Sequence, residues 1–216
     1  MRMRCSVRLL AVSALLAALT AAGCARPPSD APPADLRVLP AAVIERSRVQ
    51  KDQLFRTSAD SPIPAERRSA FRGLEYYPVS PDWQVRALLH RFPGGVPFVF
   101  TETGGTQREA QKVGYFEFTR EGKTWRLHAY RFADTPPQRA DELFVPFQDA
   151  TSGVETYGAG RYLDLAPGLG GWYVLDFNLA YHPYCAYSDA WSCPRTPAEN
   201  RLSLAVRAGE RGQVVH

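Results

Sequence analysis

After its first 22 residues, the 216-residue sequence has no long hydrophobic run. A transmembrane helix needs about 20 consecutive apolar residues, so none is expected downstream of the N terminus. The sequence also has no Gly-x-Gly-x-x-Gly fingerprint, no phosphate-binding loop and no regular alternation of strand and helix patterns. These absences argue against a dinucleotide-binding or parallel α/β protein.

Dense clusters of lysine and arginine are also missing. The whole sequence has 26 basic and 22 acidic residues, a formal net charge of +4. Arg2, Arg4 and Arg8 precede the N-terminal hydrophobic run, and without them 23 basic residues face 22 acidic ones, so the net charge falls to +1. A nucleic-acid-binding protein normally carries a concentrated basic surface, so no nucleic-acid partner is expected.

Cysteine is scarce, with four residues in the chain and no Cys-x-x-Cys pair. The paired spacing of zinc modules is therefore absent, and no metal site is predicted. Cys185 and Cys193 lie eight residues apart. In an oxidising compartment a disulfide is their expected state, and it would stabilise the fold by about 2 to 3 kcal/mol on the chain-entropy model. Free or redox-active thiols, and a metal held together with His182, are the alternatives.

The N terminus has the features of a secretory signal. Arginines precede an apolar run over residues 9–22 that is too short for a stable membrane span. The run ends in Ala21-Ala22-Gly23-Cys24, which resembles the lipobox of bacterial lipoproteins, although Leu is usual where Ala21 stands. The resemblance implies cleavage before Cys24, a lipid on its sulfur and anchoring to a membrane. Ordinary signal cleavage nearby, with Cys24 left as a free thiol, is the alternative.

The residue after Cys24 bears on location. It is Ala25 rather than Asp, and in a bacterium with two membranes the resemblance then favours the outer membrane. We therefore expect a cell-envelope protein, on the periplasmic face of that membrane. Residues 1–23 are expected to be the signal peptide, residues 24–40 a tether rich in proline and alanine, and residues 41–216 a single β-rich domain.

Two helices are expected before the strands begin. Residues 41–55 carry a sparse apolar stripe without Pro or Gly, and residues 65–72 form a second, shorter helical pattern that ends at Gly73. The period then changes to the alternation typical of strands. Strands are expected at residues 83–89 and 96–100, on either side of Pro93-Gly94-Gly95, in a hairpin of 113–119 with 125–132, and at 143–147, 160–165, 172–177 and 202–207.

This order of elements predicts the fold class. Eight or so short strands after one or two N-terminal helices are typical of an α+β fold that is mainly β. The strands are expected to form an antiparallel meander that closes into a barrel-like or sandwich-like sheet.

Long stretches of the chain resemble a known family. They are residues 147–163 and 176–188, Cys193-Pro194, Asn200-Arg201-Leu202 and Ala208-Gly209-Glu210, with residues 48–55, Ser61-Pro62 and 71–74 in the N-terminal part. Together they resemble the bacterial and archaeal family called domain of unknown function 1684. The resemblance covers nearly all of the mature chain and implies a shared fold and a shared site, without an established activity. His182 stands where Asn is expected, which argues against an essential role for His182 as a ligand.

Polar residues gather in the segment 149–187. Asp149, Glu155 and Arg161 lie in one loop-to-strand segment, and Asp176 with Asn178 ends a strand that has apolar neighbours. A carboxylate beside apolar packing needs a partner, and the guanidinium group of Arg161 suits that role. Such a network either fixes loops to the sheet or lines the mouth of a barrel. In the second case Arg161 binds an anionic ligand and a carboxylate acts as acid or base.

Tyr157 and Tyr181 are the aromatic candidates of this segment. A tyrosine ring can stack on a flat or flavin-like ligand, but it can also seal the end of a barrel. Ser152 has no histidine at a recognisable spacing and no Gly-x-Ser-x-Gly context. We therefore expect Ser152 in a turn rather than in a nucleophilic site.

The sequence thus predicts a secreted, lipid-anchored, β-rich module that binds a small ligand or a partner through residues 149–187. The alternatives are an enzyme, either a hydrolase with Asp/Glu acid-base chemistry or a flavin-type split-barrel protein, and a structural envelope protein. No cofactor is identified from the sequence.

Overall fold

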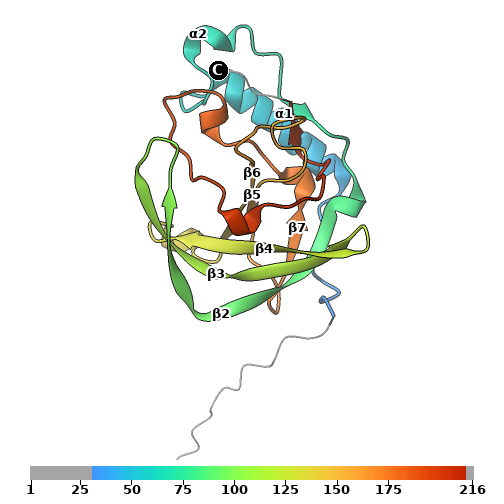
Figure 1. Ribbon diagram of the computed structural model, residues 1–216. Coiled ribbons are helices and arrows are strands. Elements are labelled where there is room, and N and C mark those ends of the chain that lie inside the picture. Colours follow the sequence, from blue (N-terminus) through green and yellow to red (C-terminus); the bar gives the residue numbers. More distant parts are fainter. Residues whose placement is uncertain (1–30, 213–216) are drawn as a thin grey trace, which may run out of the picture.

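A curled antiparallel sheet of six strands forms the body of the protein (Figure 1). The computed structural model describes residues 31–212 of the 216. In the sheet order β6-β5-β4-β3-β2-β7, the strands are β2 (Gln84–Thr101), β3 (Gln107–Arg120), β4 (Lys123–Phe132), β5 (Leu143–Phe147), β6 (Arg161–Leu165) and β7 (Trp172–Asp176). The predicted α+β class, mainly β with a barrel-like sheet, is confirmed.

The helices lie at the end of the molecule away from β2 and β3 (Figure 1). The other elements are α1 (Ala41–Thr57), α2 (Ala65–Arg68), the small antiparallel pair β1 (Glu75–Tyr76) and β8 (Glu210–Arg211), and the 3₁₀ turns η1 (Pro81–Trp83), η2 (Pro137–Arg139), η3 (Phe177–Leu179), η4 (Tyr184–Ala186) and η5 (Ala198–Asn200). Among the residues described, no helix is long and apolar enough to cross a membrane. The predicted signal peptide and Cys24 lie outside the described residues, and their roles stay predictions.

Helix α1 forms where it was expected, but α2 is shorter than the predicted segment 65–72. The chain leaves α2 at Arg68 and bends down onto α1, where Phe71 packs against Phe55 with ring centroids 6.2 Å apart. Asp52 of α1 then accepts a hydrogen bond of 3.0 Å from the backbone N–H of Leu74. These contacts with α1 replace a further turn of helix.

Strand β2 is one long strand, so the prediction of two strands separated by Pro93-Gly94-Gly95 is wrong. The glycines instead form a bulge, and the register with β3 shifts between Arg91 and Val96. Gly94 and Gly95 have φ of 72° and 70°, a conformation that L side chains rarely adopt. The N-terminal half of β2 pairs with β7, and β3 follows it on the other side. Strand β2 therefore connects the late strand β7 with the hairpin of β3 and β4 in one sheet.

The predicted hairpin is present as β3 and β4. Glu121 and Gly122 connect the strands with positive φ of 53° and 70°, which suits the twist of a tight hairpin turn. Leu127 and Ala129 are fully buried on one face of β4, as the alternation predicts. Tyr130, on the other face, is also fully buried. The sheet curls so strongly that a second aromatic cluster covers that face; it includes Phe98, Phe100, Phe132, Phe144 and Tyr162.

The sheet is nearly split between β4 and β5, where only Tyr130 and Phe144 pair. The side chain of Asn200, fully buried, fills the gap. Its Oδ1 accepts from the backbone N–H of His128 at 2.7 Å, and its Nδ2 donates to the carbonyls of His128 and Pro146 at 2.9 and 2.7 Å. One amide side chain thus supplies the hydrogen bonds that a neighbouring strand would otherwise make.

The predicted strand at residues 202–207 is wrong. Leu202, Leu204 and Val206 do point into the core, but the segment pairs with no strand. Its first part bonds to the irregular backbone after β5, through Leu202 N–H to Gln148 and Ala150 N–H to Leu204. At Val206 side chains take over: its N–H donates to Asp149 and its carbonyl accepts from Arg161, both at 2.7 Å. Apolar alternation was therefore a correct sign of burial and a misleading sign of strand pairing.

Candidate functional site

Arg161 and Asp149 form a fully buried ion pair at the start of β6. The Nη2 atom of Arg161 lies 3.3 Å from Oδ1 of Asp149, and neither side chain has any exposed surface. The guanidinium group also donates to the backbone carbonyls of Val206, Ala208 and Glu210. Burial lowers the pKa of Arg161, against the opposing effect of Asp149. The pair therefore holds the C-terminal segment against the sheet.

The other three predicted polar residues lie in two separate groups. Glu155 accepts from the exposed Arg207 at 2.6 Å and from the hydroxyl of Tyr77 at 2.9 Å, and these two donors lower its pKa. Asp176 accepts from the backbone N–H and side-chain amide of Asn178 at the start of η3. The structure thus brings Asp149 and Arg161 together and keeps Glu155 and the Asp176–Asn178 pair apart from them. None of the five lines the two cavities described below.

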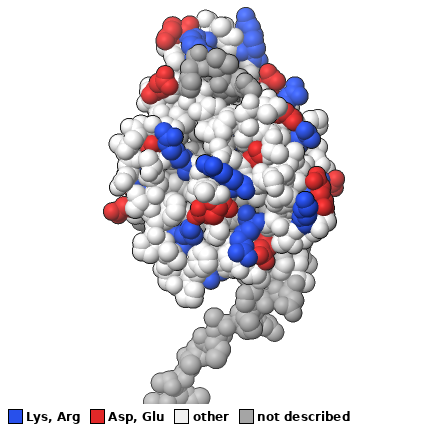
Figure 2. Space-filling view, viewed as in Figure 1, with Lys and Arg blue, Asp and Glu red and all other residues white. Residues whose placement is uncertain are grey.

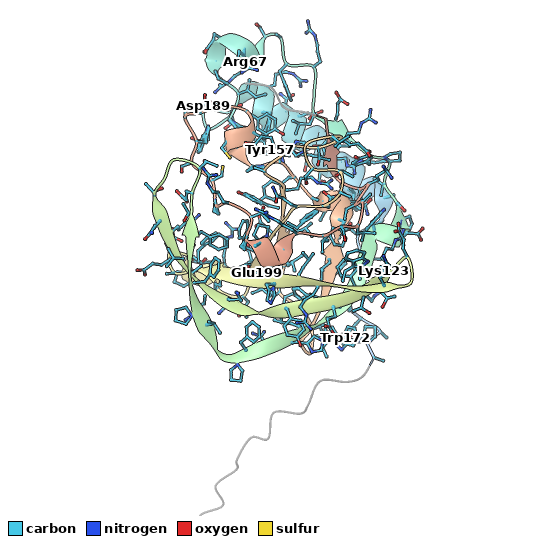
Figure 3. The ribbon with its side chains drawn as sticks, in the orientation of Figure 1. Arg67, Lys123, Tyr157, Trp172, Asp189 and Glu199 are labelled. Carbon is cyan, nitrogen blue, oxygen red and sulfur yellow. The ribbon has the colours of Figure 1, made fainter. Side chains whose placement is uncertain are left out.

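A pocket opens between the segment that follows α1 and strand β8. Its volume is about 320 Å³. Ile63, Phe71 and Leu74 provide apolar walls, Arg67 and Arg211 lie among the remaining lining residues, and the polar lining groups are His182, Tyr187 and Glu210. We call this cavity the Glu210 pocket. Figure 3 shows Arg67 and Tyr157 in the half of the molecule that contains the helices.

Glu210 is a buried carboxylate of the pocket that is 1% exposed and accepts hydrogen bonds at both oxygens. Its Oε1 lies 2.6 Å from Nζ of Lys51. Its Oε2 accepts from the backbone N–H of His182 at 2.7 Å and from the hydroxyl of Tyr187 at 3.1 Å. A buried carboxylate is tolerated only when it is paired and hydrogen-bonded in this way. The pairing leaves the base of the pocket close to electrically neutral.

The His182 side chain is buried and uncharged. Burial, with Arg161 and Lys51 nearby, lowers its pKa to about 3. Its Nε2 accepts from the backbone N–H of Tyr157 at 3.4 Å. Because a neutral imidazole carries one proton, that proton is assigned to Nδ1, 3.8 Å from Oε2 of Glu210. His182 can therefore offer one N–H donor on the side of the pocket.

Sequence reasoning missed Lys51 and Glu210 as site residues. They are 159 positions apart, and no local pattern marks them as partners. The one available signal was their place within the runs that resemble the family, residues 48–55 and Ala208-Gly209-Glu210.

Tyr181 and Tyr157 have different surroundings. The hydroxyl of Tyr181 donates to Asp164 at 2.8 Å, and its ring lines a second cavity together with Lys51. Tyr157 lies against the ring of His182, with centroids 6.3 Å apart. The two tyrosines therefore do not face a common ligand site.

The expected disulfide between Cys185 and Cys193 is not formed in this structure. Both are buried free thiols, and Sγ of Cys193 accepts from the backbone N–H of Cys185 at 3.1 Å. A hydrogen bond with Cys193 lowers the pKa of Cys185 to about 7. Among residues 31–212, no group of three or more His, Cys, Asp or Glu side chains is placed to hold a metal ion.

Comparison with known proteins gives a family and a fold relative. The model of a family described as protein of unknown function (DUF1684) matches residues 69–211. The solution NMR structure of an uncharacterized protein from Haloarcula marismortui is similar, with 38% sequence identity and a TM-score of 0.62 over 81% of this chain and 95% of that one. No curated protein matches the chain.

Replacing Arg161 by Met tests the buried pair. The change leaves the carboxylate of Asp149 buried without its cation and removes donors from three backbone carbonyls. We expect the free energy of unfolding in urea to fall by about 3 to 5 kcal/mol. Arg207→Ala, which breaks the exposed pair with Glu155, is the matched control and should leave the free energy of unfolding nearly unchanged. Equal losses in the two variants would contradict the structural role of Arg161.

Replacing His182 by Asn tests the neutral histidine. Below pH 6.5 the unfolded chain takes up a proton on His182 that the folded protein accepts only near its lowered pKa of about 3. Stability should therefore be lost as the pH falls through that window, by up to about 1.4 kcal/mol per pH unit from this one proton. His182→Asn should reduce that slope, and carboxylates common to both proteins cancel in the comparison. Parallel pH profiles of unfolding free energy would show that His182 is not held neutral.

Proposed function

Because the chain belongs to the DUF1684 family, which is described as having no known function, we propose from the geometry of the chain that it is a small-molecule-binding module of the cell envelope. The observation that carries the proposal is the Glu210 pocket. A volume of about 320 Å³ falls in the range of small-ligand sites, which are mostly apolar with a few placed polar groups.

The lining of the pocket defines the class of ligand. Ile63, Phe71 and Leu74 offer apolar contact, so the body of the ligand is aliphatic or aromatic. Both oxygens of Glu210 already accept hydrogen bonds, and Lys51 balances its charge. The Nδ1–H group of His182 is a donor beside Glu210, and Arg211 of the lining is paired with Glu75 at 3.4 Å. These features favour an uncharged ligand with an apolar body and one hydrogen-bond acceptor.

The proposed location at the cell envelope depends on the N terminus. The lipobox-like Ala21-Ala22-Gly23-Cys24 supports a lipid on Cys24 that anchors the protein to a membrane, at the periplasmic face of the outer membrane where two membranes exist. The tether of residues 24–40 would then separate the domain from the lipid surface.

On the face shown in Figure 2, acidic and basic side chains alternate without a large basic patch.

The disulfide between Cys185 and Cys193 is part of this proposal for the exported protein. The two thiols already hydrogen-bond to each other, so little movement of the chain is needed to join them. On oxidation each thiol loses its hydrogen and a sulfur–sulfur bond forms. The two electrons and two protons pass to an oxidant of the disulfide type, which leaves as a pair of thiols.

A thermal-shift screen of uncharged apolar metabolites tests ligand binding. A ligand at about 100 times its Kd should stabilise the purified protein by about 2.7 kcal/mol and raise Tm by about 5 °C or more. Ala70→Trp, which fills the pocket from its exposed rim, should remove the shift. Ala65→Trp, an exposed position of α2 outside the pocket, should keep it. A panel without any stabilising compound, or a full shift in Ala70→Trp, would contradict the proposal.

Intact mass spectrometry of protein extracted from membranes tests both covalent features. We expect the mass of a chain that begins at a lipidated Cys24, and Cys24→Ser should lose the lipid and leave the membrane fraction. Alkylation without prior reduction should add no label at Cys185 and Cys193, and reduction should expose both. An unlipidated wild-type protein would overturn the anchor, and immediate labelling of both thiols would overturn the disulfide.

A further inference from the structure

A second cavity lies on the other side of the Lys51–Glu210 ion pair. Glu210 lines the first pocket, whereas Lys51, only 2.6 Å away, lines the second. The volume of this second cavity is about 410 Å³. Its lining includes Asp164, Tyr181, Tyr184 and Trp191. We call it the Trp191 cavity.

Two exposed aromatic rings form one wall of the Trp191 cavity. Tyr184 and Trp191 are 36% and 37% exposed. Their centroids lie 5.0 Å apart in an edge-to-face arrangement. The ring of Tyr184 also packs edge-on against the buried Phe55 at 5.8 Å. The wall is therefore supported from behind by the core, and its outer surface is open to solvent.

The charged groups of the cavity select against ionic ligands. The ammonium group of Lys51 lies 4.8 Å from the centroid of the Tyr181 ring and so already occupies the position where a cationic ligand would bind an aromatic face. Asp164, whose carboxylate accepts from the Tyr181 hydroxyl at 2.8 Å, repels an anion. A neutral ligand that both donates and accepts hydrogen bonds is compatible with both groups.

We propose that the Trp191 cavity binds a saccharide. A pyranose ring presents a flat face of C–H groups that stacks on tyrosine and tryptophan, and its hydroxyl groups donate to a carboxylate and accept from an ammonium group. The ring of Trp191, set at 80° to that of Tyr184, supplies the stacking face, Asp164 the acceptor and Lys51 the donor. The site is separate from the Glu210 pocket, so it does not depend on the small-molecule ligand proposed above.

Titration of the full-length purified protein with a β-1,4-linked N-acetylglucosamine tetramer tests this site. We expect saturable binding, read from isothermal titration and from the change in tryptophan fluorescence. Trp191→Ala should weaken binding about 10-fold or more by removing the stacking surface, and Asp164→Asn should weaken it by a smaller factor. Trp191 is 37% exposed and packs against Tyr184, so its replacement should lower the thermal midpoint by only a few degrees and leave the protein folded.

Two control variants separate this proposal from others. Trp172→Phe changes a tryptophan that Figure 3 places at the opposite end of the molecule from Asp189, a close neighbour of Trp191 in the chain. Affinity for the tetramer should be unchanged in Trp172→Phe, and also in Ala70→Trp, which blocks only the Glu210 pocket. Absence of binding by the wild type, equal affinity in Trp191→Ala, or binding of a choline-type cation in place of the tetramer would each overturn the saccharide site.

Discussion

The fold depends on the ion pair between Arg161 and Asp149. Leu202, Leu204, Val206 and Ala208 complete the hydrophobic core, yet the segment that carries them is not a strand. The carbonyl groups of Val206 and Ala208 in this segment, and that of Glu210 just after it, would lose their donor if Arg161 were absent. Asp149 in turn keeps the guanidinium charge paired and binds the N–H of Val206. Two charged side chains thus allow an irregular backbone segment to form one side of the core.

Much of the sheet could be predicted because a strand that is buried on one face has an apolar residue at every second position. The hairpin of β3 and β4 follows from that alternation and from one turn signal, whereas the strand at residues 143–147 is a continuous apolar run that is buried on both faces. The same rule fails at residues 202–207, where alternating burial is real but the backbone bonds to Gln148 and Ala150, outside any strand, and to the side chains of Arg161 and Asp149. It also fails at Gly94 and Gly95, because a local pattern does not distinguish a bulge inside a strand from the end of a strand.

The candidate site was less predictable than the fold. The pairing of a buried carboxylate with Arg161 follows from the cost of an unpaired charge, but the expected carboxylate was Asp176 and the one that pairs with Arg161 is Asp149. Lys51 and Glu210 come from opposite ends of the domain, so only the folded chain shows that they meet. Their ion pair separates the Glu210 pocket from the Trp191 cavity. A substitution of Lys51 or Glu210 therefore alters the lining of one cavity and the ion-pair partner that lines the other. Ala70, in contrast, lines only the Glu210 pocket, and Trp191 lines only the Trp191 cavity.

The backbone carbonyl groups that accept hydrogen bonds from Arg161 lie late in the sequence, and this affects the order in which the domain can fold. Strand β6 and Asp149 are synthesised well before Val206, Ala208 and Glu210, whose carbonyl groups satisfy the buried guanidinium. Until those last residues are available, the guanidinium group lacks three of its hydrogen-bond acceptors and the nascent domain lacks one side of its core. Native packing is therefore reached only after nearly the whole chain has been made, and contacts between distant segments make such folding slow. We therefore expect this polypeptide to stay unfolded through most of its own synthesis.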